Sequence, residues 1–354
     1  MTVVKPDKLR ELSYKLLRGL GICEEDSRIG SEVLLSSDIR GVDSHGVARL
    51  QLYYRRLKKD LINRTPNLTR IKDLGSTVVL DADNGLGVCT APKAMKLCIE
   101  RAKEYGVATV VTRNTNHFGI AGHYALMASD ANMISLIGAN TTPFMAPFGG
   151  CERLIGTNPL AMGIPGGKFA IILDMATSLV PVGKLQIAIR KGEKIPLDWL
   201  VAKDGRPTDN PKDLWEGGAL LPMAGPKGYG LAVMIDMLAG ILAGAAIGRD
   251  IGDLLLDDRP ERIGHFMMAI DIDRFMPIET FKVAVDGYID MIKGSTPAEG
   301  VKEIFLPGEI EINKTKDRMV NGIPLNPVVA QSLLDFSREL GIAGNEDTFE
   351  DLIG

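Results

Sequence analysis

The residues whose types and spacing are best suited to chemistry are His45, Arg49 and Tyr53, which follow one another at four-residue intervals. If a helix begins at Asp43 or Ser44, both good N-cap residues, the three side chains share one face. An imidazole, a guanidinium and a phenol together offer a proton shuttle, a bidentate partner for a carboxylate and a further hydrogen-bond donor. The pattern predicts a site for a small organic acid, although an amphipathic surface helix with one histidine in its polar stripe looks the same.

The chain has four histidines, and His117 directly follows a predicted buried strand at Val107–Thr112. Loops at the carboxyl ends of strands in α/β sheets are where ligands bind. A neutral histidine there can exchange a proton with a substrate hydroxyl near neutral pH. A role in capping the helix that begins near Gly119 explains His117 equally well. His123 lies one turn further on, and packing explains it better.

Two loops between predicted strands are rich in Pro, Gly, Thr and Asn, at 140–150 and at Gly156–Pro159. This composition fixes the backbone and exposes amides, as a ligand cradle requires, and a purely structural loop has a similar composition. Asp174 ends a predicted strand at Phe169–Leu173. Its carboxylate can accept hydrogen bonds from a ribose, orient a histidine or cap a helix.

The segment Gly225-Pro226-Lys227-Gly228-Tyr229-Gly230 precedes a long apolar run. Free amides, the positive end of a helix dipole and the Lys227 ammonium predict an anion site there. No GxGxxG sequence opens a helix after a strand, so a dinucleotide would bind without the Rossmann fingerprint.

Composition is that of a globular protein: 354 residues, 24% charged and 45% hydrophobic, with a formal net charge of −4. There is no clustered basic stripe, so we expect no nucleic-acid partner. The four cysteines are scattered without metal-ligand spacing, which predicts no metal site and reduced thiols in a cytoplasmic protein. The N-terminus lacks an apolar signal region. The run Leu231–Gly248 contains Asp236, so we expect a buried helix there and no membrane span.

The elements that must position these residues follow two secondary-structure patterns. The first seventy residues are predicted to be helical, and strands and helices alternate from Gly75 onward. The first predicted helix begins at Pro6. The other predicted helices are Glu24–Arg40, Ala91–Tyr105, Gly228–Gly248, Ile278–Lys293 and Asn326–Leu340. Predicted strands are Thr77–Leu80, Val107–Thr112, Met133–Ala139, Phe169–Leu173 and His265–Ile270.

Beyond these patterns, six motifs resemble the signature blocks of the type 2 malate/L-lactate dehydrogenase family, in the family's order and across most of the chain. They are Arg40-Gly41-Val42-Asp43-Ser44-His45-Gly46, Asn116-His117-Phe118-Gly119-Ile120-Ala121, Pro147-Phe148-Gly149-Gly150, Gly156-Thr157-Asn158-Pro159-Leu160-Ala161, Asp174-Met175-Ala176-Thr177-Ser178 and Gly225-Pro226-Lys227-Gly228-Tyr229-Gly230. Some relatives carry a longer Gly-rich insertion before the last motif, where this chain has the short Met223–Pro226.

The resemblance implies a homodimeric, NAD- or NADP-dependent oxidoreductase of the α/β class. Its cofactor domain would be a non-Rossmann mixed-sheet domain at 74–250. A second, helical domain would be built from both chain ends, with 1–73 as the N-terminal part and 251–354 packing against it. The active site would lie between the domains, near the dimer interface.

The resemblance also assigns roles to residues. It implies catalytic roles for Ser44, His45, His117 and Asp174, and substrate binding by Arg49 and Tyr53. Cofactor contacts carry over to the following residues: Thr141, Asn158, Asp174, Met175, Ala176, Lys227, His265, Phe266 and Met267. Which of the two histidines moves the proton stays open, as does the preference for NAD or NADP.

The expected reaction is hydride transfer between the nicotinamide and a small 2-hydroxy acid, malate with oxaloacetate or lactate with pyruvate. The alternative is reduction of a related 2-oxo or cyclic imino acid by the same site: sulfopyruvate, oxalurate, piperideine-carboxylate or diketogulonate. A hypothesis from a different class is a non-catalytic metabolite-binding protein with this fold.

Overall fold

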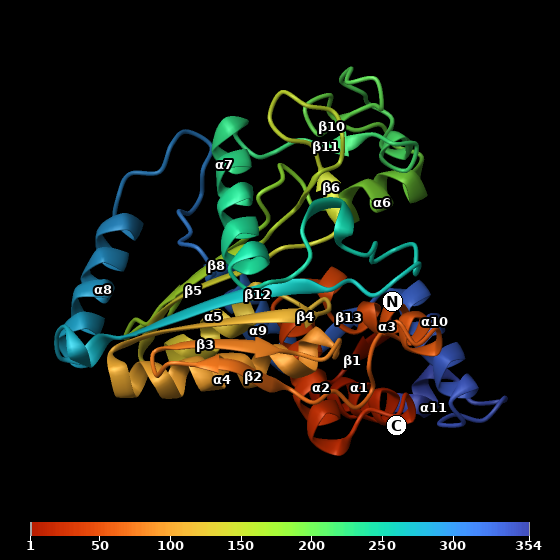
Figure 1. Cartoon of the computed structure of the whole chain (residues 1–354), viewed down its shortest axis with the longest axis horizontal. Helices are drawn as coiled ribbons and strands as arrows, with labels where there is room; N and C mark the ends of the chain where they lie inside the picture. Colours follow the sequence, from red (N-terminus) through yellow and green to blue (C-terminus); the bar gives the residue numbers. More distant parts are fainter. Residues whose placement is uncertain (1, 354) are drawn as a thin grey trace.

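A seven-stranded sheet forms the centre of the molecule (Figure 1). The computed structural model describes residues 2–353, apart from the side chain of Arg190. In spatial order the strands are β2 (Thr69–Asp73), β3 (Thr77–Asp81), β4 (Val107–Thr115), β12 (Ile263–Asp271), β5 (Met133–Ala139), β8 (Leu160–Ile164) and β9 (Ile171–Met175). Only β3 and β4 pair in parallel, and every other pair in this sheet is antiparallel. The expected mixed α/β class is confirmed.

The strand directions bring the expected site loops to one edge of the sheet, the edge formed by the ends of the strands. Thr115 at the end of β4 pairs with Ile263 at the start of β12, and Ala139 at the end of β5 pairs with His265. Met175 at the end of β9 pairs with Leu160 at the start of β8. The segments that follow β4, β5 and β9, and those that precede β8 and β12, therefore emerge side by side at this edge.

Helices cover both faces of the sheet (Figure 1). On one face α4 (Gly87–Tyr105) and α5 (Ala121–Asp130) bury alanine, methionine and tyrosine side chains against strand residues such as Val110, Ile137 and Met267. On the other face lie α7 (Pro226–Ile235) and a π-helical turn at Asp236–Ile241. Successive strand residues point to opposite faces, so Phe266 packs toward α7 while His265 and Met267 point toward α4 and α5.

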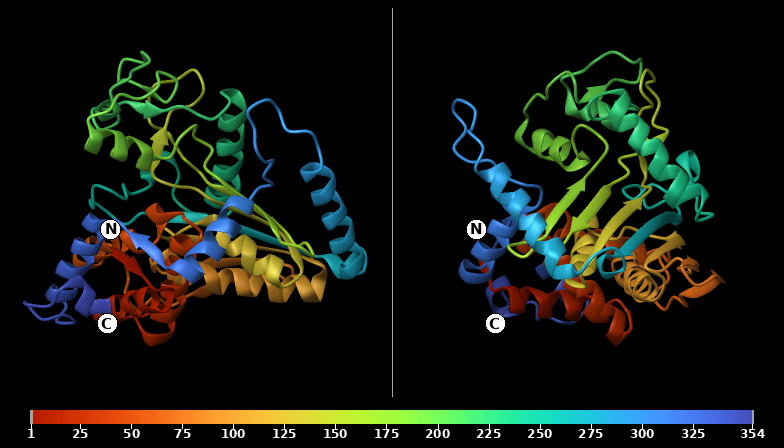
Figure 2. Two further views of the ribbon diagram at one scale, coloured as in Figure 1. Left: turned by 180° about the vertical axis from the view of Figure 1, so that it is seen from behind. Right: turned by 90° about the vertical axis from the view of Figure 1, so that its left-hand side faces the viewer.

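Both ends of the chain meet in a helical part at one end of the sheet (Figure 2). It contains α1 (Pro6–Gly19), α2 (Glu24–Ile39), α3 (Leu50–Lys58), α10 (Pro327–Glu339) and α11 (Phe349–Ile353), and the pair of strands β1 (Thr2–Val4) and β13 (Ile323–Leu325). One hydrophobic core joins Leu16, Leu34 and Tyr53 to Leu333 and Phe349. The domain boundaries at 73 and 250 stay a prediction, and β12 of the C-terminal segment lies within the central sheet.

A smaller sheet lies beyond the central one. Its order is β10 (Leu200–Val201), β11 (Ala219–Leu220), β6 (Pro143–Met145) and β7 (Ile155–Gly156), and it packs with α6 (Val182–Lys191). Two further helices, α8 (Ile278–Lys293) and α9 (Glu309–Asn321), follow β12 in the chain.

The expectation that Leu231–Gly248 forms one buried helix is wrong. Helix α7 ends at Ile235 and continues only as the π-helical turn. Met234 is 56% exposed and Leu242 58% exposed, because only the side of the helix that carries Ala232 and Ile235 packs against the rest of the protein. Within residues 2–353 no helix is long and apolar enough to cross a membrane.

Candidate active site

The segment around His45 is not the single helix that the spacing predicts. Two short 3-10 turns, Asp43–His45 and Val47–Arg49, come before α3, which begins only at Leu50. His45, Arg49 and Tyr53 therefore do not form one stripe of a continuous helix.

The interruption has a local cause at Gly46. Its backbone is extended (φ −87°, ψ −143°), and the next residue, Val47, donates its N–H to the buried carboxyl of Asp38 at 2.8 Å. The carboxyl lies so close that a Cβ on Gly46 would fall 2.0 Å from Asp38 Oδ1. Asp38 thus takes up a backbone donor and fixes the chain in two turns, which spacing alone could not reveal.

Two histidines from distant parts of the chain nevertheless come together. The rings of His45 and His117 stack with centroids 5.4 Å apart and planes at 28°. Each uses its Nδ1 atom in a hydrogen bond: His117 with the Tyr53 hydroxyl at 2.7 Å, and His45 with the Ser44 hydroxyl at 2.9 Å. Ser44 is exposed, whereas Tyr53 is fully buried. Two hydrogen-bonded pairs, one in the interior and one at the surface, are thus brought together by the stacked rings.

Arg49 lies beside both histidines. Burial lowers the pKa of His45 to about 3 and the pKa of His117 well below its ordinary value, and the Arg49 charge adds to both shifts. Among the described residues no carboxylate forms an ion pair with Arg49, and its Nε atom is buried without a hydrogen-bond partner. An unpaired guanidinium next to neutral imidazoles is a receptor for a carboxylate.

Glu261, which was not identified from the sequence, holds the backbone of His117 in this cluster. It is 2% exposed, and its carboxylate accepts the backbone N–H of His117 at 3.0 Å. Burial raises its pKa to about 7, and the nearby Arg56 and Arg49 charges oppose that rise. Its partner is 144 positions away in the chain, so no local pattern could have identified it.

Arg318 was also missed. It reaches from α9 to the turn that carries Ser44, where its guanidinium pairs with the Asp43 carboxylate and donates to the Asp38 carbonyl. The side chain is 7% exposed. A helix from the C-terminal segment thereby holds the segment next to Ser44 and His45.

Among the described residues, Asp174 forms no hydrogen bond with His45 or His117. Its Oδ2 atom accepts the N–H of Gly122 at 2.8 Å, in the first turn of α5. The surrounding protein raises its pKa to about 6, which the Gly122 N–H and the nearby Arg40 oppose. Of the three roles considered, binding to a helix N-terminus is the one that the contacts support.

The expected cofactor residues on the loops lie along the same sheet edge. Asn158 Oδ1 accepts the N–H of Thr141 at 3.1 Å, and its Nδ2 donates to the carbonyl of Ala232 in α7 at 3.0 Å. The half-buried Met175 and Ala176 follow at the end of β9. Lys227 is exposed in the first turn of α7. Asn158 is fully buried, and its two hydrogen bonds join the Thr141 loop to α7.

The three expected residues in β12 are inside the protein. His265 is fully buried and stacks on Phe118 with ring centroids 4.4 Å apart. Met267 is also fully buried, and Phe266 is 7% exposed. His265 and Met267 are buried because they point toward α4 and α5, which cover that face of the sheet, and their predicted contact with a cofactor stays a prediction.

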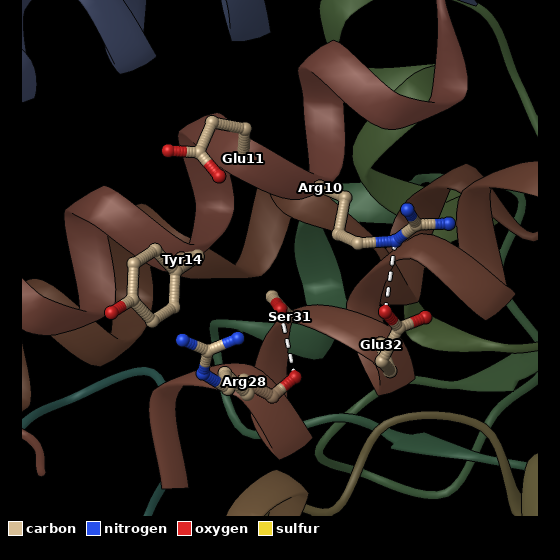
Figure 3. Close-up of a pocket in the computed structure, with 6 residues that line it drawn as sticks. All are labelled: Arg10, Glu11, Tyr14, Arg28, Ser31 and Glu32. Atoms are coloured by element: carbon tan, nitrogen blue, oxygen red, sulfur yellow. Dashed lines mark hydrogen bonds and ion pairs between the residues drawn. The ribbon is translucent and has the colours of Figure 1, made fainter. Parts of the chain in front are cut away.

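A surface cavity of about 380 Å³ lies between α1 and α2, away from these residues (Figure 3). Its charged groups already have partners in the protein: Arg10 pairs with Glu32 at 2.8 Å, and Arg28 pairs with Glu24 and lies over the Tyr14 ring at 5.5 Å. None of the expected site residues lines it.

Comparison with known proteins agrees with the geometry. The family model "Malate/L-lactate dehydrogenase" matches residues 4–334. The chain belongs to this family. It is 42% identical to the L-sulfolactate dehydrogenase of Methanocaldococcus jannaschii over 96% of this chain and 98% of that protein. The solved structure of that enzyme covers 100% of both chains with a TM-score of 0.91 and 41% identity.

Two other relatives carry related names. The malate dehydrogenase of Pyrococcus horikoshii is 38% identical over 96% of both chains. The ureidoglycolate dehydrogenase (NAD(+)) of Escherichia coli K12 is 34% identical over 94% of this chain and 95% of that protein. The family places the chain among hydroxyacid dehydrogenases, which are oxidoreductases that use a nicotinamide cofactor.

Proposed function

We propose that this protein catalyses reversible hydride transfer between NAD or NADP and a small 2-hydroxy acid. The observation that carries the proposal is the unpaired Arg49 guanidinium beside the stacked pair of His45 and His117. A carboxylate on Arg49 would place the neighbouring carbon and its oxygen next to the imidazoles, which is the arrangement that oxidation of a 2-hydroxy acid needs.

The proposed substrates are malate and oxaloacetate, or lactate and pyruvate. The names of the malate and sulfolactate dehydrogenases among the relatives favour an acid with a second anionic group. The alternative substrates are sulfopyruvate, oxalurate, piperideine-carboxylate and diketogulonate, all of which present a carboxylate or its equivalent next to the reacting carbon.

Each residue of the site has a separate role in the proposed reaction. Arg49 binds and orients the substrate carboxylate through paired hydrogen bonds. The histidine pair binds the substrate oxygen and moves its proton, and Ser44 connects that pair to solvent. Binding of an anion to Arg49 offsets the charge that lowers the pKa of both histidines, so substrate binding makes the imidazoles better bases.

The chain also has groups that fit a nicotinamide cofactor, which supplies the hydride acceptor when bound. Exposed Lys227 in the first turn of α7 provides a positive charge at the N-terminus of that helix, which suits a phosphate group. Thr141 and the segment Asp174–Ala176 provide polar atoms along the sheet edge. The antiparallel strand β12 in the middle of the sheet differs from a doubly wound parallel order and supports a non-Rossmann cofactor domain.

The proposal includes a homodimer. Leu231, Met234, Met237, Ile241 and Leu242 form an exposed apolar row along α7 and the turn that follows it. A second copy of the chain covering this row would remove the apolar surface from water. Four free cysteines support a reducing, cytoplasmic setting for the protein.

A panel of acids tests the proposed reaction. Oxaloacetate, pyruvate, sulfopyruvate, oxalurate and piperideine-carboxylate are each incubated with NADH and with NADPH while the nicotinamide absorbance is followed. We expect oxidation of one reduced cofactor with at least one 2-oxo acid. Binding of organic acids by calorimetry without any absorbance change would instead identify a metabolite-binding protein.

A further inference from the structure

Two groups approach the Nδ1 atom of His117. The hydroxyl of Tyr53 lies 2.7 Å away, and the backbone N–H of Gly119 points at the same atom from 3.4 Å. A backbone N–H is only ever a donor, whereas a phenol can donate or accept. The arrangement therefore allows the proton position on the ring to be assigned by counting donors and acceptors.

If Nδ1 carried the ring proton, two donors would lose their acceptor. The Gly119 N–H would face another N–H, and the Tyr53 hydroxyl would have to donate elsewhere. Tyr53 is fully buried, and among the described residues its hydroxyl has no other hydrogen-bond partner. Each unsatisfied buried donor costs about 1–3 kcal/mol. With the proton on Nε2, the Nδ1 lone pair accepts the Tyr53 hydroxyl at 2.7 Å and is shared with the weaker contact from the Gly119 N–H.

The doubly protonated ring is disfavoured by its surroundings. His117 lies among Tyr53, His45, Arg49 and His265, and its burial and the positive charge of Arg49 both oppose a further positive charge. The Glu261 carboxylate contacts the backbone N–H of His117 and leaves the imidazole without an acidic partner.

From this geometry, and on the basis of the proposed function, we infer that His117 is held in the Nε2-protonated tautomer and acts as a fixed hydrogen-bond donor to the substrate oxygen. His45 then moves the proton. Among the described residues the hydrogen-bond partner of its Nδ1 atom is the Ser44 hydroxyl, which can donate or accept, so the His45 ring can change its protonation state without leaving a donor unsatisfied.

In the oxidation direction the bonds and charges balance through His45. The O–H bond of the substrate breaks, and its proton binds His45 Nε2. The hydrogen on the carbon that bears this oxygen leaves as hydride to the oxidised nicotinamide cofactor. The electron pair of the broken O–H bond forms the new C=O bond. The new carbonyl oxygen accepts a hydrogen bond from His117 Nε2–H. The charged His45 ring donates its Nδ1–H to Ser44, which is exposed, and the proton passes to water.

Nitrogen NMR of the full-length protein with labelled histidine tests the tautomer directly, without substrate or cofactor. Chemical shifts separate a protonated ring nitrogen from an unprotonated one, and a His117→Gln variant assigns the signals. We expect His117 to show a protonated Nε2 and an unprotonated Nδ1 near neutral pH. A protonated Nδ1, or two protonated nitrogens, would overturn the inference.

Two substitutions on α3 provide a matched comparison. Tyr53→Phe removes one of the two donors to Nδ1, so we expect the Nδ1-protonated form of His117 to become more populated. Tyr54→Phe removes a hydroxyl that instead contacts Glu339 at the surface, so we expect the His117 signals to be unchanged. Equal spectra for both variants would show that Tyr53 does not set the tautomer.

Kinetics separates the roles of the two histidines. His117→Gln keeps an N–H donor at the end of the side chain but no base, whereas His45→Gln removes the group that moves the proton. We expect His45→Gln to lower kcat at least ten times more than His117→Gln does. An equal or larger loss in His117→Gln would assign the proton to His117. Absence of activity in the wild-type protein, with the Nε2–H signal present, would reject the proposed function and leave the tautomer intact.

Discussion

Replacement of Arg49 by Met removes the charge that the proposed site depends on, while it keeps an unbranched apolar side chain. A hydrogen bond to a charged group contributes about 1.5–3 kcal/mol, so a two-bonded carboxylate would lose about 3–6 kcal/mol. At about 1.4 kcal/mol for each factor of ten, kcat/KM falls by about 100-fold or more. Because Arg49 has no protein partner among the described residues, we expect little change in the free energy of unfolding.

The same substitution has an effect on the histidines that needs no substrate. The positive charge of Arg49 helps to lower the pKa of His45 to about 3. Without it, the pKa of His45 rises toward its ordinary value, which an NMR titration of the free protein measures. The rise makes His45 a better base, yet it does not restore activity, because the substrate is no longer held in position.

The control is Arg55→Met on α3, the helix that directly follows Arg49. Arg55 is 45% exposed and pairs with Asp257 at 3.0 Å. Asp257 is 7% exposed and also lies near Arg56 and Lys59. Arg55 does not contribute to the pKa shift of His45 or His117, so we expect kcat/KM and the His45 titration to match the wild-type protein. The reasoning is refuted if Arg49→Met stays within tenfold of the wild-type kcat/KM, or if the His45 titration does not move.

Three further predictions concern the supports of the site. Gly46→Ala would place a Cβ 2.0 Å from Asp38 Oδ1, so we expect urea denaturation to show a loss of about 3 kcal/mol or more, and a loss below about 1 kcal/mol would contradict the packing described. Burial raises the pKa of Asp38 from 3.8 to about 8, so the folded protein holds this proton more tightly than the unfolded chain does. The free energy of unfolding of the wild-type protein, measured relative to Asp38→Asn, should therefore fall as pH rises from about 4 to about 8 and then level off. A difference that does not change with pH would show that Asp38 is ionised in the folded protein. Glu261→Ala leaves the His117 N–H without an acceptor and should lower stability by about 1–3 kcal/mol, whereas Glu261→Gln keeps an acceptor and should cost less; equal losses in the two variants would contradict a role for that hydrogen bond.

Strands β4 and β5 of the central sheet could be predicted from sequence because most of their residues are apolar and at least partly buried, whereas β2 and β8 were not predicted. Met133–Ala139 has the predicted bounds, and β4 starts at the predicted Val107 and extends three residues further, to Thr115. Helix α8 also has the predicted bounds of Ile278–Lys293. Strand order was beyond reach, since nothing in the local pattern indicates that β12 inserts between β4 and β5.

The short or amphipathic elements were harder. β1 and β13 have three residues each, and helix α9 was not predicted. Two β strands of this length are stabilised by pairing with each other, which a scan along the chain does not see. The exposed side of α7 was misjudged because apolar composition reports hydrophobicity, not the direction in which each side chain points.

The residue types of the site could be predicted, but their geometry could not. His45, Arg49 and Tyr53 were identified from an assumed continuous helix, and they meet His117 although Asp38 interrupts that helix. Glu261 and Arg318 were missed because their partners lie 144 and 275 positions away. Contacts of this range depend on the packing of the sheet against the helical part.

The central claim is that Arg49 and the two histidines receive one 2-oxo acid beside the nicotinamide. A crystal structure of the protein with reduced cofactor and oxamate, a non-reacting mimic of a 2-oxo acid, tests it most directly. The account predicts the oxamate carboxylate on Arg49 and its 2-oxygen within hydrogen-bond distance of His117 Nε2. Oxamate bound elsewhere, or its carboxylate held by Lys227 instead of Arg49, would contradict the account.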